Sequence, residues 1–360
     1  MREYIFIFGR EPELSFLETA SYFQSHDITY KIVEWKNEVA VFLLEDLDFE
    51  LLIKRLGGTV KIGEVFLEYK YKGSDNKLNY GISVYSGDGN QLRDYLQKEF
   101  RKEKVKAVFR KSKDKVFMPS EIFAKNLIEF VVYNKYYART IAVFNPRDYK
   151  ERDERRPRQI LLHQVSLRLA RILVNLSFAR YNLLDPFCGV GTILQEGMIS
   201  GIDVYGVDID NESIDASREN LNWLKEKYNL KNNFKIIRGD SGKLARYFGR
   251  NEIHAVATEP DLGPYYRKMP SKEEVDGVIK VLENLYYDFF LGLRQVMKKK
   301  GKVAIVLPRL KYKNGYRDVN VGRIISGAGF NIFIADKKIK PPIISKGRFL
   351  DRMIYVFEAA

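Results

Sequence analysis

Short apolar runs alternate with segments of helical periodicity along the second half of the chain. Continuous apolar runs predict buried strands, and apolar residues spaced three or four apart predict helices. The predicted elements are, in order, helix 164–178, strand 183–184, helix 192–200, strand 203–208, helix 212–228, strand 234–239, strand 255–258, helix 272–298, strand 302–308, helix 320–327, strand 330–337 and strand 351–358. Alternation of this length indicates a mostly parallel sheet with helices on both faces.

The first half shows the same kind of alternation in two shorter series. Residues 1–70 predict a β-α-β-β-α-β order, typical of a small ferredoxin-like module, with elements at 4–8, 13–25, 29–34, 39–44, 49–56 and 61–69. Residues 79–143 predict strand 80–85, helix 90–100, strand 106–110, helix 120–129 and strands near 130–133 and 138–143. Ten of the twelve residues 147–158 are charged, and they show no apolar periodicity, which predicts an exposed linker. We therefore expect domains at 1–72, 73–145 and 161–360, with a linker at 146–160.

A turn rich in small residues joins strand 183–184 to the next helix. It reads Asp185-Pro-Phe-Cys-Gly-Val-Gly-Thr192, and Gly189 and Gly191 let the backbone approach a ligand closely. The helix that follows offers unpaired N–H groups. A second strand ends at Asp208, about 20 residues later, where a nucleoside-binding α/β unit places an acid on the ribose hydroxyls.

The ligand of this turn is predicted to be a nucleoside rather than a phosphate-rich group. The stretch lacks the Gly-Lys-Ser/Thr ending of a P-loop and the three-glycine fingerprint of dinucleotide-binding units. Asp185 would repel a pyrophosphate but attract a cationic ligand. S-adenosylmethionine fits that description.

Four acids follow four of the predicted strands: Asp185, Asp208, Asp240 and Glu259. Ligands of parallel sheets bind beyond the carboxyl ends of the strands, so these acids predict one site. Two simpler roles compete with this interpretation. Asp185 could serve merely as the N-cap of the next helix, and Asp240 could be an ordinary turn residue. Asp210 is an alternative ribose ligand, but Asp208 is the residue that ends the apolar run.

The charge balance predicts a polyanionic partner. The 360 residues include 61 Lys and Arg against 47 Asp and Glu, a formal net charge of +14. A membrane surface is the competing partner, but the sequence has no apolar run of 18 residues and no basic amphipathic N-terminal helix. No signal peptide is visible either, so we expect a cytoplasmic protein.

The densest basic stretch is 98–115, with nine Lys and Arg against three acids and with apolar residues interleaved. The candidate phosphate contacts in it are Arg101, Lys102, Lys104, Lys106, Arg110, Lys111, Lys113 and Lys115. A second basic group, which could border the catalytic pocket, comprises Lys298–Lys300, Arg309, Lys311, Lys313 and Arg317.

Cysteine and histidine usage restricts the chemistry. The single cysteine, Cys188, excludes an intrachain disulfide and a cysteine-rich zinc site, and we expect it to be a packing residue. His26, His163 and His254 are far apart and show no metal-ligand spacing, so we expect no metal. No cysteine lies near Glu259, which argues against methylation of cytosine C5 through a covalent intermediate.

The second half resembles class I S-adenosylmethionine-dependent methyltransferases with a Rossmann-like sheet. The stretch Asp185-Pro-Phe-Cys-Gly-Val-Gly-Thr-Ile-Leu-Gln-Glu196 is similar to the cofactor motif of the THUMP-domain tRNA methyltransferases that modify guanosine at N2. An N-terminal ferredoxin-like module, a THUMP-like segment near 75–145 and an Arg/Asp-rich linker ending in Arg156-Pro157 follow the order of that family. The resemblance implies that the THUMP-like segment binds tRNA ends.

The resemblance also implies roles for the acids and the turn. Asp185 and the Gly189–Gly191 turn would hold the amino-acid part of the cofactor, Asp208 its ribose and Asp240 its adenine amino group. The full set of expected cofactor contacts is Asp185, Pro186, Phe187, Gly189, Gly191, Thr192, Asp208, Ile209, Asp240, Ser241 and Glu259.

The catalytic motif departs from the family pattern of Asp/Asn-Pro-Pro-Tyr/Phe. Here the stretch reads Thr258-Glu-Pro-Asp-Leu-Gly-Pro-Tyr-Tyr266. Glu259, Pro260 and Asp261 are the expected catalytic residues, and they would orient an exocyclic amine toward the methyl group. Since Leu262 replaces the stacking aromatic residue, Tyr265 or Tyr266 would stack on the base.

Three functions follow from these observations. The first is a tRNA methyltransferase acting on a base nitrogen, with guanosine N2 as the favoured target. The second is an inactive tRNA-binding paralogue, which the altered motif favours. The third is a DNA amino-methyltransferase, which the RNA-directed N-terminal half disfavours. The sequence leaves open whether a small partner protein takes part.

Overall fold

The computed structural model describes residues 1–73, 75–159, 165–334, 336, 339 and 341–360. They form two compact units, Met1–Thr19 with Asp27–Glu151, and Ala20–His26 with Arg152–Ala360. Several predicted features fall wholly or partly outside the described residues: His163, the start of helix 164–178, part of strand 330–337 and the last residue of linker 146–160. The start of the predicted domain 161–360 lies outside them as well.

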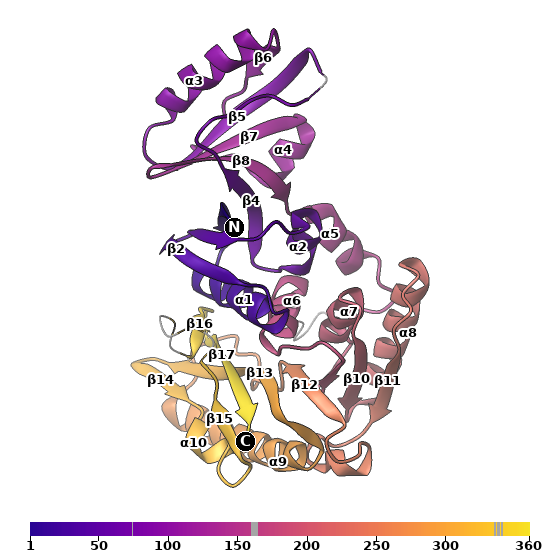
Figure 1. Cartoon of the computed structure of the whole chain (residues 1–360). Helices are drawn as coiled ribbons and strands as arrows, with labels where there is room; N and C mark the ends of the chain where they lie inside the picture. The colour runs from indigo at the N-terminus through magenta and orange to yellow at the C-terminus, as the bar shows by residue number, and fades with distance from the viewer. Residues whose placement is uncertain (74, 160–164, 335, 337–338, 340) are drawn as a thin grey trace. The chain divides into compact units, whose positions relative to one another are not determined.

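The first unit is built on an eight-stranded sheet of order β2-β3-β1-β4-β8-β7-β5-β6. Its elements are β1 (Arg2–Phe8), α1 (Pro12–Ser25), β2 (Tyr30–Lys36), β3 (Val39–Leu44), α2 (Phe49–Arg55), β4 (Thr59–Val65), β5 (Lys77–Ser86), α3 (Gly89–Lys102), β6 (Lys106–Phe109), α4 (Pro119–Ala124), β7 (Leu127–Tyr133) and β8 (Tyr136–Val143). They appear in indigo to magenta in Figure 1.

The order β2-β3-β1-β4, with β1 antiparallel to both β3 and β4, is the ferredoxin-like arrangement expected for the first 70 residues. Strand β4 then pairs antiparallel with β8 and continues the sheet into the second series of strands. The segments predicted as separate domains, 1–72 and 73–145, therefore share one sheet and, except for Ala20–His26, belong to one compact unit.

The predicted helix 120–129 is too long. Helix α4 ends at Ala124, and Asn126 adopts a positive φ of 42°, which stops the helix. Strand β7 begins at Leu127, and Glu129 lies buried within the sheet, where its carboxylate accepts a hydrogen bond from Lys61 Nζ. Glu129 interrupts the apolar run of β7, so the sequence pattern around it predicted a helix instead of a strand.

The second unit is a nine-stranded sheet with the main order β11-β10-β9-β12-β13-β17-β15. Its elements are α6 (Leu167–Leu176), β9 (Asn182–Asp185), α7 (Thr192–Ile199), β10 (Asp203–Asp208), α8 (Asn211–Lys227), β11 (Phe234–Arg238), the 3-10 helix η1 (Ser241–Arg246), β12 (Ile253–Thr258), α9 (Lys272–Val296), β13 (Met297–Tyr312), β14 (Gly315–Asp318), α10 (Val321–Ile324), β15 (Phe330–Ile332), β16 (Ile343–Ser345) and β17 (Leu350–Ala359). The elements η1, β14 and β16 were not predicted from the sequence.

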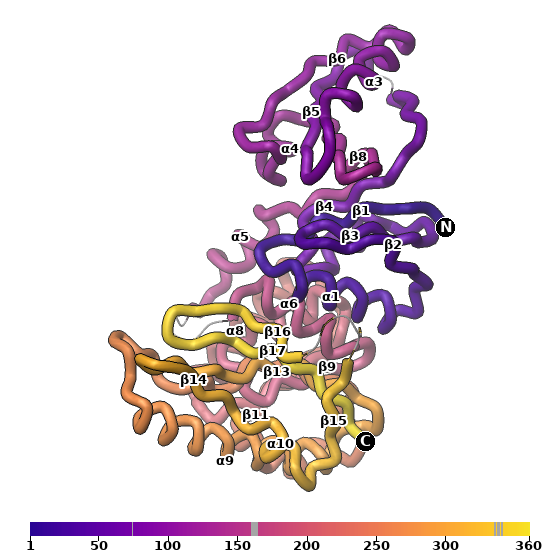
Figure 2. Tube along the Cα trace, turned by 90° about the vertical axis from the view of Figure 1, so that its left-hand side faces the viewer, coloured from indigo at the N-terminus to yellow at the C-terminus, as the bar shows by residue number. Residues whose placement is uncertain are grey.

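Strands β11, β10, β9, β12 and β13 are parallel, and β17 runs antiparallel beside β13. Strand β17 also pairs with β16, so the three strands β16, β17 and β13 lie side by side (Figure 2). The strand order reverses between β9 and β12, and a reversal of this kind opens a crevice for a ligand at the carboxyl ends of the strands. The predicted Rossmann-like sheet is confirmed.

Helix α9 fixes the loop that follows β12. Ser271 and Glu274 form a capping box at its start, each side chain accepting a hydrogen bond from the other residue's backbone N–H. The helix buries Phe289, Phe290 and Leu293 in the core of this unit. Such burial anchors α9, from which Tyr286 reaches back to the loop after β12.

Most described residues of the predicted linker 146–160 are exposed, but the stretch also contains a helix and two buried side chains that were not predicted. Residues Pro146–Glu154 form helix α5, and the Arg152 and Arg156 side chains are buried. Arg152 Nε donates to Glu196 Oε1 at 3.1 Å, and Arg156 Nη1 donates to Thr192 Oγ1 at 3.0 Å. Charged side chains that find buried polar partners give no apolar periodicity, so the sequence pattern could not reveal this packing.

In the part of the chain that the structure describes, no helix is both long and apolar enough to cross a membrane.

Candidate cofactor and catalytic site

The four predicted acids lie at one edge of the second sheet. Asp185 and Asp208 end β9 and β10, Asp240 follows β11 by two residues, and Glu259 comes directly after β12. Because these strands are parallel neighbours, their carboxyl ends meet at the crevice. The structure therefore brings the four acids to the same edge.

Asp185 is the most buried of the four, with 2% of its surface exposed. Its Oδ1 accepts hydrogen bonds from Thr258 Oγ1 at 2.7 Å and from the Phe187 N–H at 3.2 Å. Burial raises the pKa of Asp185 to about 7; these two bonds oppose the rise, and the charges of Asp208 and Glu259 add to it. A carboxylate in this setting gains most from a cationic ligand.

The alternative role of Asp185 as a helix cap does not hold. Gly191, and not Asp185, occupies the N-cap position of α7. The acid instead connects the ends of β9 and β12 through Thr258.

The glycine turn is held against the end of β10. Gly189 N–H donates to Asp208 Oδ2 at 2.8 Å, and Cys188 N–H donates to the Val207 carbonyl at 3.0 Å. Gly189 and Gly191 have φ values of 48° and 83°, where a side chain is strained. A Cβ on Gly191 would come within 2.6 Å of Ser217 Oγ, whereas one on Gly189 would meet no atom within 4 Å. The space beside Gly189 is thus open to a ligand.

Asp208 and Asp210 have different roles. Asp210 caps α8 by accepting from Ser213 N–H at 2.8 Å, and this bond lowers the pKa of Asp210. Asp208 ends the strand and accepts from backbone N–H groups on both sides, Gly189 and Asp210. Between the two acids, Ile209 leaves 73% of its surface exposed. The predicted role of Asp208 at the ribose, and of the exposed Ile209 at the adenine face, stays a prediction.

Asp240 is tied into its own turn. It caps η1 by accepting from Gly242 N–H at 2.9 Å, and its Oδ2 lies 2.8 Å from Lys243 Nζ. The hydrogen bond from Lys243 lowers the pKa of Asp240, and so does that from Gly242. The adjacent Ser241 is buried. The contact of Asp240 and Ser241 with the adenine stays a prediction.

Glu259 is held by a strand remote in the sequence. Its Oε1 accepts from Arg352 Nε on β17 at 2.7 Å. Pro260 is buried next to it, and Asp261 is exposed. The Asp261 carboxylate accepts from the Gly263 N–H at 2.9 Å, and its backbone carbonyl accepts from the Tyr286 hydroxyl. These contacts give Asp261 a part in shaping the loop, and a role in catalysis remains a prediction.

Of the two tyrosines expected to stack on a base, Tyr265 leaves 75% of its surface exposed. Tyr266 is partly buried and packs against the core that contains α9. Leu262, at the family's aromatic position, is buried. Tyr265 is therefore the better candidate.

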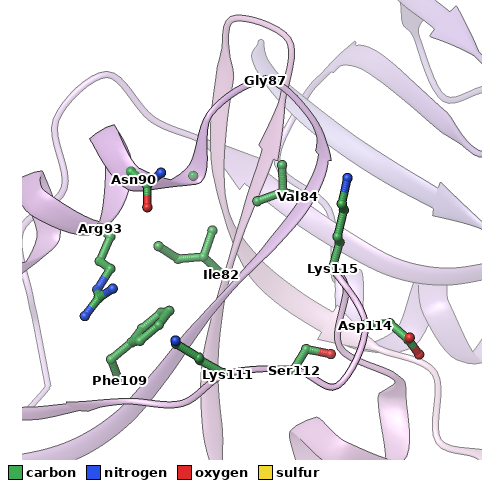
Figure 3. Close-up of a pocket in the computed structure, with 11 residues that line it drawn as sticks. Ile82, Val84, Gly87, Asn90, Arg93, Phe109, Lys111, Ser112, Asp114 and Lys115 are labelled. Carbon is green, nitrogen blue, oxygen red and sulfur yellow. The ribbon is translucent and has the colours of Figure 1, made fainter.

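All eight basic residues predicted to contact phosphates are exposed. Lys111 and Lys115 line a hollow of about 450 Å³ together with Arg93 and Phe109. Arg93 lies over the Phe109 ring, with its guanidinium carbon 4.4 Å from the ring centroid. Figure 3 shows Arg93 and Lys111 on either side of Phe109, with the Asp114 carboxylate turned away.

Arg93 was not predicted as a phosphate contact, because it lies in α3 before the basic stretch 98–115. Only the fold brings it to β6 and the loop that follows. Arg101, Lys102, Lys104 and Lys106 lie near the other end of α3 or just after it, away from Gly89, which lines the hollow.

The second basic group is divided between the two edges of the second sheet, and Arg309 and Lys311 follow the carboxyl end of the β13 segment that pairs with β12. Lys298–Lys300 lie at the start of β13, level with the start of β12, and so at the opposite edge of the sheet. Three of the other four are paired with acids: Arg309 with Asp318, Lys311 with Asp351 and Arg317 with Asp276.

Cys188 is buried, and burial raises the pKa of its thiol well above the usual value, which suits a packing residue. His254 is partly buried, and burial lowers its pKa. Among the described residues, no group of three His, Cys, Asp or Glu side chains is arranged to hold a metal ion.

The parallel sheet with its switch point, the antiparallel strand β17, the glycine turn after β9 and the acids at successive strand ends define a class I methyltransferase domain. Residues 156–314 match the family described as UPF0020, RMKL-like, methyltransferase domain. The match covers less than half of the chain, and it shows that this stretch is similar to methyltransferase domains of that family.

Two curated relatives carry the name tRNA (guanine(10)-N2)-dimethyltransferase. The protein of Pyrococcus abyssi is 34% identical over 151 residues, which cover 40% of this chain and 44% of that relative. The protein of Methanothermobacter thermautotrophicus is 24% identical over 320 residues, which cover 86% of this chain and 89% of that relative. The alignment with the Pyrococcus protein thus spans less than half of that relative's length.

Among solved structures, TrmN from Thermus thermophilus has a TM-score of 0.52 and 14% identity, with 99% of this chain and 100% of that chain covered. At this identity the likeness concerns the fold. It agrees with the fold that the resemblance implies, and the family match supports a methyltransferase domain in residues 156–314. S-adenosylmethionine, the methyl donor of this class, is the cofactor that the site is expected to hold.

Proposed function

We propose that this protein is an S-adenosylmethionine-dependent tRNA methyltransferase that acts on the exocyclic N2 of a guanosine. One observation carries the proposal: a buried Asp185, hydrogen-bonded to Thr258, stands beside an open glycine turn at the switch point of the sheet. The match of residues 156–314 to a methyltransferase family and the names of the relatives support it.

The residues at this edge fit the cofactor. The space beside Gly189 and the buried Asp185 carboxylate suit the amino-acid part with its ammonium group. Asp208 suits the ribose hydroxyls and Ile209 the adenine face, with Asp240 and Ser241 at the adenine edge. Pro186, Phe187 and Thr192, which belong to the same turn, are the remaining proposed contacts of the cofactor.

When bound, the cofactor supplies an electrophilic methyl group. The protein's part is to place the guanine amine and to direct its lone pair. Glu259 and the Pro260 carbonyl accept the amine hydrogens, so that the nitrogen presents its lone pair to the methyl carbon. Methyl transfer would break the bond between the sulfonium sulfur and the methyl carbon as the N–C bond forms, and Glu259 would accept the proton that the amine loses. A base inside a folded tRNA must be turned out of its stack, and the exposed Tyr265 is the residue proposed to stack on it.

The hollow lined by Arg93, Phe109, Lys111 and Lys115 is the proposed phosphate contact in the first unit. The stacked Arg93 and the two lysines offer positive charge, and Phe109 offers an aromatic edge. The exposed Arg101, Lys102, Lys104, Lys106, Arg110 and Lys113 extend this basic surface along α3 and β6. A tRNA substrate agrees with the cytoplasmic location that the sequence predicts.

Incubating the purified chain with labelled S-adenosylmethionine and unmodified tRNA, rRNA or DNA tests the proposal. Label in tRNA supports it, and label in DNA alone supports the DNA amino-methyltransferase instead. No label, together with retained tRNA binding, would identify an inactive tRNA-binding paralogue. Label in tRNA without added proteins would also show that no partner subunit is needed. Asp185→Ala serves as the control that keeps the scaffold and loses the cofactor.

A further inference from the structure

Arg352 and Glu259 are 93 positions apart in the sequence and meet at the predicted catalytic loop. Arg352 Nε donates to Glu259 Oε1 at 2.7 Å, with 36% and 9% of the two side chains exposed. Hydrogen bonds between a guanidinium and a carboxylate are short and about twice as strong as neutral ones. The pair therefore fixes the carboxylate of the residue that takes the acid position of the motif.

The sheet explains how Arg352 reaches this place. Thr258, the last residue of β12, pairs with Ile305 of β13, and Arg352 of β17 pairs with Pro308, three positions further along β13. Arg352 is thus level with the loop that begins at Glu259. Strand β13 lies between β12 and β17, and two strand spacings amount to roughly 10 Å. A long side chain is needed to cross that distance.

The neighbouring charges are paired elsewhere. Asp351 contacts Lys311 Nζ at 2.6 Å, and Arg309 contacts Asp318 at 2.7 Å. Successive residues of a strand point to opposite faces, so Asp351 and Arg352 face different sides of the sheet. Because Asp351 is paired with Lys311 and Arg309 with Asp318, neither competes with the contact between Arg352 and Glu259.

We propose that Arg352 is a positioning residue for methyl transfer, which acts by fixing the orientation and balancing the charge of Glu259. The inference rests on the proposed function. Glutamate is one methylene longer than the Asp or Asn of the family pattern, so its carboxylate has an additional torsion to fix. The negative charges of Asp208 and Glu259 both act on Asp185. The Arg352 guanidinium balances the charge of Glu259. Arg352 is what lets the loop use Glu in place of the shorter side chain.

Steady-state kinetics of Arg352→Met, Arg352→Lys and Arg352→Gln on tRNA tests the proposal. We expect Arg352→Met to lower kcat by roughly tenfold to a hundredfold, because a misplaced acceptor weakens orientation of the amine. The KM for tRNA and the affinity for S-adenosylhomocysteine should stay within about twofold, since Arg352 is expected to contact neither of them. Arg352→Lys should recover part of kcat, and Arg352→Gln serves if Arg352→Met does not fold.

Two further variants separate positioning from support of the fold. Lys302→Met breaks the Lys302–Glu358 ion pair between the same strands, at the other end of β13, and should leave kcat unchanged. Arg352→Met combined with Glu259→Gln should be no slower than Glu259→Gln alone, because the two residues act as one unit.

Three results would overturn the inference: an unchanged kcat in Arg352→Met, fully additive losses in the double variant, or a kcat loss that only follows a loss of folded protein. A wild-type chain that transfers no methyl group would instead refute the proposed function, so the two failures are distinguishable.

Discussion

Thr258 Oγ1 donates a hydrogen bond to Asp185 Oδ1 at 2.7 Å and so joins the last residue of β12 to the last residue of β9. The two strands flank the point where the order of the sheet reverses. The bond places the proposed cofactor acid directly beside the proposed catalytic loop. In the proposed function, cofactor binding and substrate orientation would therefore depend on the same hydrogen-bonded pair of strand ends.

We predict that Asp185→Ala abolishes binding of S-adenosylhomocysteine and leaves the affinity for tRNA unchanged. The variant removes the buried carboxylate at the turn, whereas the proposed RNA contacts of the first unit are untouched. Calorimetric titration with the cofactor product and filter binding of tRNA measure the two effects. An unchanged cofactor affinity would refute the assignment of the site.

The raised pKa of Asp185 predicts a dependence of stability on pH. The folded-state pKa, about 7, lies above the ordinary value of 3.8, so the folded protein holds the proton more tightly than the unfolded chain. The free energy of unfolding therefore falls as pH rises between these values and reaches its full loss above pH 7. Asp185→Asn should be more stable than the wild type at pH 8, by up to roughly 4 kcal/mol, and equally stable near pH 4. Urea unfolding at the two pH values, without cofactor, measures the difference; equal stability at pH 8 would contradict the prediction.

Arg156→Met should weaken cofactor binding and lower stability. The buried guanidinium donates to Thr192 at the first turn of α7, directly after the glycine turn. Loss of a buried charged hydrogen bond costs about 1–3 kcal/mol. Thermal unfolding and cofactor titration measure both effects, with Arg155→Met, at an exposed neighbouring position, as the control. Equal losses of stability and cofactor affinity in the two variants would contradict a specific role for the buried Arg156.

Neutralising Lys111 and Lys113 should weaken tRNA binding and flatten its dependence on salt. For each lysine that binds a phosphate, its neutralisation reduces the slope of log K against log salt by about 1. Arg93→Met should act in the same direction through the hollow beside Phe109. Neutralising Lys298 and Lys299, at the opposite edge of the methyltransferase sheet from the acids, provides the matched control. A slope that stays unchanged in the test variants would exclude these lysines as phosphate ligands.

The sequence predicted that the four acids lie at one edge of the sheet, because the signals for this are local. The turn between β9 and α7 contains its own acid and glycines, and the remaining acids each follow a recognisable strand. Parallel pairing then brings them to one edge without any further information. The ferredoxin-like order of β1 to β4 was predictable for the same reason.

The contacts that support this edge were not predictable, because they join segments far apart in the chain. Arg352 lies 93 residues from Glu259, and Arg93 meets Phe109 only when α3 packs on its sheet. The buried Arg152 and Arg156 belong to a stretch that reads as a solvated linker. In each case a charged residue is buried or stacked by a partner that the local pattern does not contain.

Mass spectrometry of nucleosides from tRNA treated with the purified protein and S-adenosylmethionine tests the central claim most directly. We predict guanosine with one or two methyl groups on N2, present after incubation with the wild type and absent after incubation with Asp185→Ala. Unmodified guanosine, or a methyl group on any other base atom, would contradict it.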